Sequence, residues 1–418
     1  MAFYKVRIAD CCIIRPPKSE ARKLLKDTDK VSFVPMRDLG IDSKHLNLEE
    51  ERELSTVSGS YTYFADNDVL LAKITPCFEN GKLGIASGLT NGVGFGSSEF
   101  IVLRSKETVA PTYLYYFLSQ PSFRLAGQAV MTGAVGHRRV PNDYIENTEI
   151  PLPSISEQKR IVAILDEAFA DIEQVRAKTE QNLKSARELF ESYLQQVFTQ
   201  RGESWSKYLL GEVCTFKHGF AFKGEYFCDE SEFLLLTPGN FFEDGGYRDR
   251  GQKQKYYDGV FPEEYLLNKG DLIVAMTEQA AGLLGSPALI PEDGMFLHNQ
   301  RLGLVELTSD FNGNVKLEFL FHLFNTSYFR SKVQETASGV KVRHTSPKKM
   351  QAIPVWMPND LSEQEAIANK LFEVKEQSLE LEQVYSEKLK LLDELKKSIL
   401  QKAFSGELPQ KNNQGAVA

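Results

Sequence analysis

One segment of the sequence occurs twice, and this repeat constrains the fold more than any other feature. Ser156-Glu157-Gln158 returns as Ser362-Glu363-Gln364, and the pattern Leu194, Gln195, Phe198 returns as Leu400, Gln401, Phe404. Both ends are displaced by 206 residues (156 to 362 and 198 to 404), so the copies align without a gap. The chain therefore uses one structural unit twice.

Each copy predicts a long helix, because its mostly apolar positions step by four and three, as in a coiled-coil seam. The first seam comprises Ile161, Leu165, Ala168, Ile172, Val175, Thr179, Asn182, Ala186, Leu189 and Tyr193. The second comprises Ile367, Leu371, Val374, Ser378, Leu381, Tyr385, Lys388, Leu392, Leu395 and Ile399. Ser156 and Ser362 suit N-caps, while Gly202 and Gly406 suit helix ends. The predicted helices span 156–200 and 362–405.

The segments that precede the helices also match each other. Asp68–Ala72 is similar to Asp271–Ala275. Phe123-Arg124 recurs as Phe329-Arg330, again 206 residues later. Short β-rich runs separated by Gly, Asn and Asp turns indicate loop-rich domains containing β-strands over 1–155 and 201–361. We therefore predict an α+β fold of two tandem domains, each followed by a long helix, with the two helices pairing as an antiparallel coiled coil. The polar tail 406–418 is expected to be disordered.

Composition is that of a soluble globular protein. The 418 residues are 42% hydrophobic, and the N-terminus lacks a signal-peptide pattern. No apolar run approaches the length of a membrane span, so a cytoplasmic location is expected. The five cysteines show no C-x-x-C spacing, which supports neither a disulfide framework nor a zinc ribbon.

The net charge of −8 does not exclude nucleic acid, because the basic residues are clustered. The stretch 331–350 carries five cations against Glu335 alone, and 137–139 reads His-Arg-Arg. Such a chain could bind DNA locally without coating it non-specifically, and the alternative is a solvated charge run.

The sequence contains no recognisable catalytic motif. A phosphate-binding G-x-x-x-x-G-K-[ST] loop, an H-E-x-x-H motif and a nucleophile elbow are all absent. The glycine-rich stretch 92–96 lacks the strand, helix and acidic partner of a dinucleotide site, so a β-turn is favoured. His218, His298 and His344 stand in polar loops and are more simply loop residues than ligands.

Several segments resemble one protein family. Ile150–Ile161 and Trp356–Gln364 are similar to the motif that opens each conserved helix of the specificity subunit of type I restriction-modification systems. Further segments resemble parts of the target recognition domains of that family, namely Phe33–Met36, Asp68–Lys82, Gly211–Val213 and Lys269–Ile273.

This resemblance implies a non-catalytic DNA-binding subunit. Residues 1–155 and 201–361 would be target recognition domains, each reading one half of a split site in double-stranded DNA. The paired helices would set the spacing and dock two methyltransferase subunits, which motor-nuclease subunits join. The subunit itself would bind no cofactor or metal; S-adenosylmethionine, and ATP with Mg, would belong to the partners. The alternatives are a structural coiled-coil scaffold and a DNA-binding adaptor of another complex.

Candidate DNA-binding residues follow from polar and basic loops after the strands, whose side chains suit bases or phosphates. In the first domain they are Lys73, Thr75, Asn80, Lys82, Arg138 and Arg139. In the second they are Gln279, Asn299, Gln300, Arg301, Lys341, Arg343 and His344.

The helices carry the candidate protein interface. The residues assigned to the coiled coil or to a partner are Leu165, Ile172, Val175, Leu183, Leu194, Leu371, Leu381, Leu389, Leu392 and Leu400. Leu183, Leu194, Leu389 and Leu400 lie off the seam and are predicted to form a second apolar stripe for the methyltransferase subunits. Thr179, Asn182, Ser378 and Lys388 interrupt the seams and are predicted to specify the antiparallel register.

Overall fold

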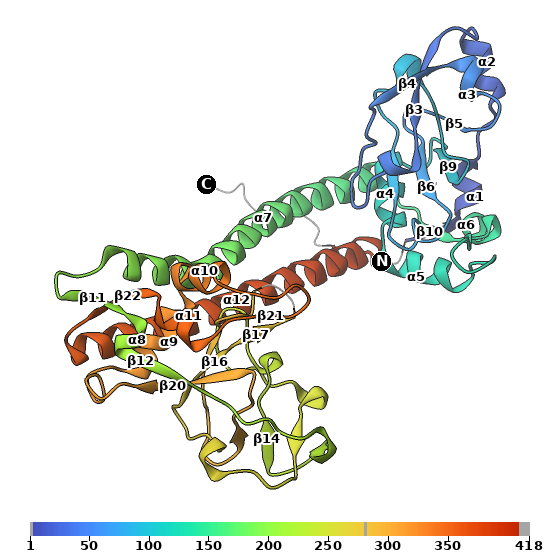
Figure 1. The fold of residues 1–418 in the computed structure, drawn as a ribbon. Coiled ribbons are helices and arrows are strands. Elements are labelled where there is room, and N and C mark those ends of the chain that lie inside the picture. The colour runs from blue at the N-terminus through green and yellow to red at the C-terminus, as the bar shows by residue number, and fades with distance from the viewer. Residues whose placement is uncertain (1–2, 280–281, 409–418) are drawn as a thin grey trace, which may run out of the picture. The chain divides into compact units, whose positions relative to one another are not determined.

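The computed structural model describes residues 3–279 and 282–408 and divides into two compact units (Figure 1). Unit 1 comprises Met1–Glu180 and Glu387–Ala418, and unit 2 comprises Gln181–Ser386. The predicted disorder of the tail concerns 406–418, of which 409–418 lie outside the described residues. Each unit contains one globular domain and one part of each long helix.

Unit 1 contains two four-stranded sheets and a two-stranded ribbon. The first sheet is antiparallel, in the order β2 (Cys12–Ile14), β9 (Phe100–Ser105), β6 (Val69–Ala72), β7 (Leu83–Ile85). The second has the order β4 (Glu50–Glu53), β3 (Lys30–Val34), β8 (Val93–Gly96), β5 (Thr62–Ala65), with β3 and β8 parallel. The ribbon pairs β1 (Lys5–Arg7) with β10 (Glu149–Pro151). The helices are α1 (Ile8–Cys11), α2 (Ser19–Leu24), α3 (Leu54–Val57), α4 (Pro111–Leu118), α5 (Pro121–Ala129) and α6 (Asn142–Asn147).

The glycine-rich stretch of unit 1 is a strand and not only the turn favoured from sequence. Val93–Gly96 forms β8, a buried central strand of the second sheet. A Cβ on Gly94 would lie 2.2 Å from the ring of Phe64, so glycine lets this ring pack directly on the backbone.

Unit 2 repeats the strand order of the first sheet of unit 1, while its second sheet differs. Its first sheet has the order β12 (Cys214–His218), β20 (Leu302–Leu307), β16 (Leu272–Ala275), β18 (Pro287–Leu289). Its second has the order β13 (Phe227–Cys228), β15 (Tyr256–Tyr257), β14 (Phe233–Leu235), β19 (Phe296–Leu297), and again one pair, β14 with β19, is parallel. Two ribbons pair β11 (Trp205–Leu209) with β22 (Pro354–Pro358) and β17 (Thr277–Glu278) with β21 (Arg343–His344). The helices are α8 (Leu210–Val213), α9 (Leu317–Asn325), α10 (Ser327–Glu335) and α11 (Pro347–Gln351).

The long helices are α7 (Ile155–Gln200) and α12 (Leu361–Ser405). Their first turns are capped by Ser154 and Asp360, which are 206 residues apart, and not by the predicted Ser156 and Ser362. The Ser154 hydroxyl accepts from the Glu157 amide at 3.4 Å, and the Asp360 carboxylate accepts from the Ser362 amide at 3.0 Å. A carboxylate or hydroxyl there satisfies an N–H that the helix leaves free.

The helix ends differ between the two copies. Gly406 has a φ of +83° and ends α12 as predicted, in the left-handed region that favours glycine. After α7 this conformation is taken by Arg201, with a φ of +35°, and not by Gly202.

Each domain core receives the start of one long helix and the end of the other. In unit 1, α4 packs against Ile161 and Leu165 of α7 and against Leu400 and Phe404 of α12. In unit 2, α9 packs against Ile367 and Ala368 of α12 and against Phe198 of α7. Two ring contacts are equivalent by the 206-residue offset, Tyr113 with Phe404 at 5.0 Å and Phe319 with Phe198 at 5.3 Å. Such packing requires antiparallel helices.

Ion pairs between the helices show the same direction. In unit 1, Glu173 lies 3.9 Å from Lys396, and Arg176 pairs with Asp393. In unit 2, Arg187 lies 3.2 Å from Glu382. Residue numbers on α12 fall as those on α7 rise, so the antiparallel helix pairing of the α+β prediction is confirmed.

The predicted seam is correct at some positions and one residue off at others. Leu165, Ile172 and Leu371 are buried, and Leu392 is half-buried. Val175 and Leu381 are 38% and 37% exposed, so their assignment to the seam is wrong. The less exposed position is the next residue in each case, Arg176 or Glu382. Along α7 the buried and half-buried positions 165, 169, 172, 176, 179, 183, 186 and 190 still step by four and three, so the heptad is kept. Every second seam position, however, lies one residue later than predicted.

The predicted second stripe is also wrong at two of its four leucines. Leu194 is 0% exposed and packs with Leu371 in unit 2, while Leu400 is 4% exposed and lies in the core of unit 1. The globular domains cover both residues, which helical periodicity alone cannot indicate. Leu183 and Leu389 are half-buried.

The polar residues of the seam differ in their contacts. Ser378 is buried and donates to the Ala186 carbonyl at 2.5 Å, a bond between the two helices. Thr179 is buried but donates within its own helix, to Val175, and Lys388 is exposed. Of the four predicted residues, Thr179, Asn182, Ser378 and Lys388, Ser378 alone forms a hydrogen bond to the other long helix within the part of the chain that the structure describes.

Two buried glutamines tie the long helices to the domains. Gln158 donates to the carbonyls of Thr108 and Pro153, both at 2.9 Å, and accepts from the Ala110 amide at 2.8 Å. Gln364 does the same in unit 2, with Asn314 at 3.2 Å, Pro358 at 2.9 Å and the Lys316 amide at 3.0 Å. The glutamine of the repeated Ser-Glu-Gln thus satisfies three backbone groups beside the start of α4 or α9.

Over the described ranges, no helix is both long and apolar enough to cross a bilayer.

Candidate nucleic-acid interface

Each domain brings its two predicted basic segments together. In unit 1 the chain leaves β6 and pairs Ile74 with Arg139, which also bridges to Thr132. In unit 2 it leaves β16 and pairs β17 with β21, and His344 also bridges to Ser338. The loop after the central strand and the glycine-containing loop before β10 or β22 are therefore neighbours in both domains.

Most of the unit 1 candidates have partners within the protein. The Lys73 ammonium donates to the Ser98 carbonyl at 3.0 Å, and burial lowers its pKa. The Thr75 hydroxyl donates to Glu79 at 2.7 Å. Lys82 donates to the carbonyls of Met36 and Leu39 at 2.8 and 2.9 Å. Its ammonium group holds the loop together through these two bonds, and a role for Lys82 in contacting DNA stays a prediction.

Asn80 and the two arginines remain at the surface of unit 1. Asn80 is exposed, and the Arg138 guanidinium is 4.0 Å from Glu79. Arg139 donates to both oxygens of Glu99, at 2.9 and 2.8 Å. The hydrogen bonds from Arg139 lower the pKa of Glu99, so this carboxylate stays charged and partly neutralises the arginine.

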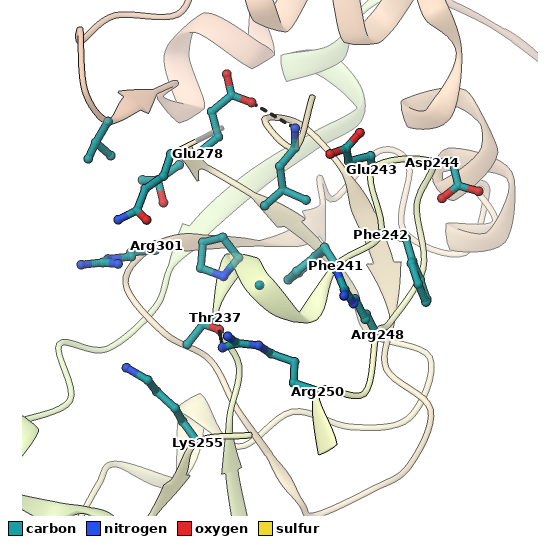
Figure 2. Close-up of a pocket in the computed structure, with 16 residues that line it drawn as sticks. Thr237, Phe241, Phe242, Glu243, Asp244, Arg248, Arg250, Lys255, Glu278 and Arg301 are labelled. Carbon is teal, nitrogen blue, oxygen red and sulfur yellow. Dashed lines mark hydrogen bonds between the residues drawn. The ribbon is translucent and has the colours of Figure 1, made fainter. Parts of the chain in front are cut away.

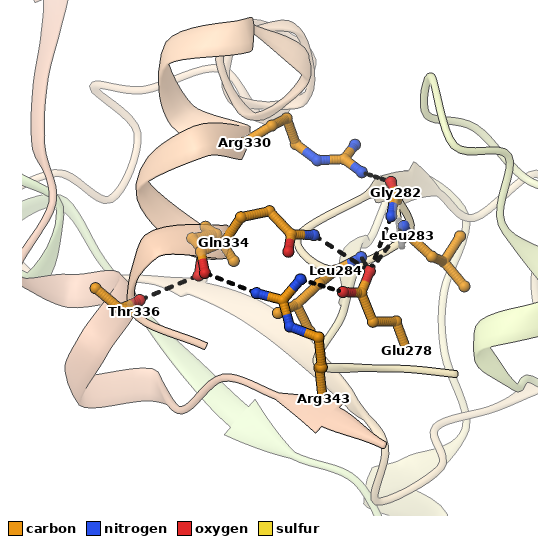
Figure 3. Close-up of polar contacts among 9 residues, drawn as sticks. Glu278, Gly282, Leu283, Leu284, Arg330, Gln334, Thr336 and Arg343 are labelled. Carbon is orange, nitrogen blue, oxygen red and sulfur yellow. Dashed lines mark hydrogen bonds and ion pairs between the residues drawn. The ribbon is translucent and has the colours of Figure 1, made fainter. Parts of the chain in front are cut away.

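In unit 2 a buried carboxylate organises the corresponding loop (Figure 3). Glu278 is 2% exposed and accepts from the amides of Gly282, Leu283 and Leu284 at 3.1, 3.0 and 2.8 Å. It also accepts from Arg343 at 3.2 Å, whose guanidinium donates further to the Gln334 carbonyl. Arg343 makes both of these hydrogen bonds within the protein, and its assignment as a DNA-binding residue stays a prediction.

The same loop contacts the arginine of the repeated Phe-Arg pair. Arg330 donates to the carbonyls of Gly282 and Glu243. In unit 1 a Cβ on Gly81 would lie 1.8 Å from the Arg124 guanidinium. Gly81 and Gly282 both have positive φ, +78° and +115°. Glycine allows the backbone both this conformation and the close approach to the arginine.

A cleft of about 790 Å³ opens beside this loop in unit 2 (Figure 2). Four cations line it: Arg248, Arg250, Lys255 and Arg301. Over residues 3–279 and 282–408, none of the four forms an ion pair with a carboxylate. The Arg250 guanidinium lies 3.5 Å from the Thr237 hydroxyl, and Arg248 lies 5.9 Å from the ring centre of Phe242. The cleft thus presents positive charge that the described protein does not neutralise.

The two ends of the cleft differ in charge. Lys255 and Arg301 lie on the side of Thr237, while Glu243 and Asp244 lie at the other end (Figure 2). Asp244 is 3.8 Å from Lys375 of α12. A polyanion is therefore attracted to the end with Arg301 and repelled from the end with Glu243.

Four of the unit 2 candidates border this site. Gln279 and Arg301 line the cleft, and Asn299 and Gln300 line an adjoining cavity of about 240 Å³ that shares Lys255 and Arg301. Lys341 and His344 are exposed but line neither cavity. His298 is buried, which lowers its pKa to about 4 and excludes it from a surface contact.

Arg248, Arg250 and Lys255 were missed from sequence. The signal was present, because residues 247–255 hold four cations against Asp249 alone. The prediction relied on the internal repeat, and this segment has no matching sequence in the first domain.

The donor set suits recognition of an anionic ligand. Guanidinium and carboxamide groups can make paired hydrogen bonds to phosphates or to base edges. In the part of the chain that the structure describes, no group of three His, Cys, Asp or Glu side chains is arranged to hold a metal ion.

Known proteins share both the sequence and the fold. The family described as type I restriction modification DNA specificity domain matches residues 4–183 and 202–391. The EcoAI specificity subunit from Escherichia coli is 33% identical over 187 residues, which cover 43% of this chain and 32% of that protein. The EcoEI specificity subunit from the same species is 34% identical over the same shares. The chain thus matches about a third of the length of these two relatives.

The fold resembles that of the HsdS subunit from Thermoanaerobacter tengcongensis. The TM-score is 0.69 at 19% identity, and the alignment covers 97% of each chain. The family match spans most of the sequence, once over each domain with the helix that follows it. This chain therefore belongs to the type I restriction modification DNA specificity domain family.

Proposed function

We propose that this chain is the DNA-reading specificity subunit of a type I restriction-modification complex and has no catalytic activity of its own. The observation that carries this proposal is the unpaired basic cleft of unit 2, in one of two domains whose first sheets share one strand order. The family membership and the names of the relatives support the same role.

In this proposal each domain reads one half of a split double-stranded DNA site. The first sheets of the two domains share one strand order, but the loops that border the cleft in unit 2 differ from those of unit 1. Two domains with a like first sheet and unlike loops fit two half-sites of unlike sequence. The antiparallel helices α7 and α12 would set the spacing between the half-sites.

Methyltransferase subunits would dock on the helices, and motor-nuclease subunits would join them. Because Leu194 and Leu400 are buried, the docking surface must use other side chains. Leu391 and Leu395 of α12 are 54% and 47% exposed and one turn apart. We assign the dock to this pair; loss of co-purification with the methyltransferase subunit in Leu391→Glu, but not in Lys390→Glu, tests the assignment. S-adenosylmethionine and ATP with Mg would be bound by the partners, in the cytoplasm.

The cleft is tested by removing two of its cations. The variant Arg248→Ala/Arg250→Ala should weaken binding of the assembled complex to its DNA, because phosphate contacts dominate affinity. Each lost phosphate contact should also reduce the slope of log K against log salt by about 0.9. Fluorescence anisotropy over a salt series measures both quantities.

Lys253→Ala is the matched control, since Lys253 belongs to the same basic segment but does not line the cleft. It should leave the salt slope near that of the wild type. Equal slopes for the double variant and this control would show that DNA does not occupy the cleft.

A further inference from the structure

The apolar anchors of the long helices are the same in both copies of the repeat. Leu194 and Phe198 end α7 in the core of unit 2, and Leu400 and Phe404 end α12 in the core of unit 1. These anchors would fit equally well if α7 paired with α7 of a second chain. Apolar packing therefore does not explain why α7 pairs with α12, and the discrimination must lie in residues that differ between the copies.

Two ion pairs are the same contact made once in each unit. Arg176 pairs with Asp393 in unit 1, and Arg187 pairs with Glu382 in unit 2. Position 176 of α7 corresponds to 382 of α12, and 187 corresponds to 393, by the 206-residue offset. Both arginines are on α7, and both carboxylates are on α12.

This distribution makes each helix repel its own copy. In an α7–α7 pair of the same geometry, Arg176 of one chain would face Arg187 of the other, twice per dimer. In an α12–α12 pair, Glu382 would face Asp393, again twice. Like charges in these places are unfavourable, whereas the observed pairing places opposite charges together.

A second pair of equivalent contacts shows the same asymmetry. Lys396 lies 5.5 Å from the ring centre of Phe169 in unit 1, and Lys375 lies 5.4 Å from that of Phe190 in unit 2. Both phenylalanines are on α7 and both lysines are on α12, at corresponding positions. An α12–α12 pair would exchange two cation–π contacts for two lysine–lysine contacts.

We propose that these eight residues form a pairing code that makes α7 and α12 complementary to each other and repulsive to copies of themselves. The code selects against assemblies that contain one recognition domain twice. It favours those that contain both unlike domains. This inference concerns helix pairing and does not depend on what the domains bind.

The test removes the repulsion between like helices and keeps the opposite charges of the observed α7–α12 pairing together. In the full-length variant Arg187→Glu/Glu382→Arg, the observed pairing still places opposite charges together. An α7–α7 pair would now place Arg176 of one chain opposite the carboxylate introduced at position 187 of the other, so the repulsion between like helices is removed. Because residues 176 and 187 would face each other, the midpoint of such a pair falls at residues 181 and 182. Asn182→Cys is therefore added as a reporter that forms a disulfide between two α7 helices.

We expect disulfide-linked dimers on a non-reducing gel to increase by roughly 2- to 30-fold over the wild-type background carrying the same reporter, as expected for relief of two exposed like-charge contacts. The matched control, Arg187→Lys/Glu382→Asp with the reporter, changes the same positions but keeps their signs and should resemble the wild type. Thermal unfolding should show similar midpoints for both variants. Dimer yields that are equal in the swap and the control, whether high or low, would overturn the proposal.

Discussion

Single buried polar residues position the loops of the candidate site. Glu278 collects three backbone amides and the Arg343 guanidinium, and so fixes the segment that follows Gly282 beside the cleft. A buried carboxylate is tolerated there because every close neighbour donates to it. Over the described residues the cleft cations form no ion pair with a carboxylate, so their charge is available to an anionic ligand.

Buried histidines should make unit 2 sensitive to mild acid. His322 is 0% exposed among the rings of Phe190, Phe321 and Phe372, and burial lowers its pKa to about 3. The unfolded chain takes up this proton near pH 6.5, whereas the folded chain does not. Its contribution to stability is therefore complete above about pH 6.5 and is lost progressively as the pH falls towards 3.

Replacing His322 with phenylalanine should remove the part of this dependence that His322 contributes, while buried His298 keeps its own. Between pH 6.5 and 5 the wild type should lose about 2 kcal/mol more unfolding free energy than His322→Phe, because one proton fewer is linked to unfolding. Urea titrations at the two pH values measure the difference. The exposed His344→Gln provides the control and should retain the wild-type dependence. If His322→Phe also retained it, the histidine would not be the linked group.

At the scale of elements, the repeat is maintained by contacts that are local to each helix start. Gln158 and Gln364 make the same three hydrogen bonds, and Ser154 and Asp360 cap the same turn. The equivalence explains why these short segments stay alike while the surrounding loops differ. Each long helix leaves its domain in a defined direction because these bonds hold its first turn.

Truncating either glutamine should destabilise the unit that contains it. Gln158→Ala leaves buried carbonyls and an amide without partners, which should cost about 2 to 4 kcal/mol of unfolding free energy. Differential scanning calorimetry should show that Gln158→Ala lowers the unfolding temperature of unit 1. Gln364→Ala should lower that of unit 2 in the same way. The exposed neighbour Lys159→Ala should change little. Equal midpoints for Gln158→Ala and Lys159→Ala would show that the hydrogen bonds contribute nothing.

At the scale of the whole molecule, the chain divides into two units, and each unit contains residues from both copies of the sequence repeat. Each unit takes its domain from one segment and its helices from both repeats. Neither half of the sequence contains all the residues of its own core, since Phe404 completes unit 1 and Phe198 completes unit 2. The two domains should nevertheless act separately in recognition, because each belongs to its own compact unit.

Exchanging residues 1–155 for those of a relative should therefore alter one half of the methylated site only. The second half should persist, since the basic cleft of unit 2 is unchanged. Methylome sequencing of cells that carry the exchanged chain and its partners reads out both halves. A change in both would contradict the assignment of one domain to each half.

Lengthening a helix is the complementary control for this exchange. A matched insertion in α7 and α12 should alter the spacing between the halves and leave the sequence of each half intact. A changed half-site sequence with unchanged spacing would rule out the helices as the element that sets the distance.

The sequence by itself determined the repeat, the two long helices and the α+β class. Hydrophobic periodicity and repeated sequence segments are properties of the chain itself, and they can be recognised without knowledge of tertiary contacts. The start of α7 lies within one residue of the prediction for this reason.

Only the tertiary structure decided which helix side chains are buried and which polar side chains form hydrogen bonds within the protein. Val175 and Leu381 lie outside the seam because the second seam position of each heptad is the next residue along the helix, which the apolar pattern alone did not indicate. Leu194 is buried because a distant domain covers it. Lys82 and Arg343 form hydrogen bonds within the protein because carbonyls or a carboxylate from remote segments approach them. The cleft cations from 248–255 meet Arg301 only through the pairing of strands. Contacts between residues far apart in the chain depend on the folded backbone, which local sequence patterns do not encode.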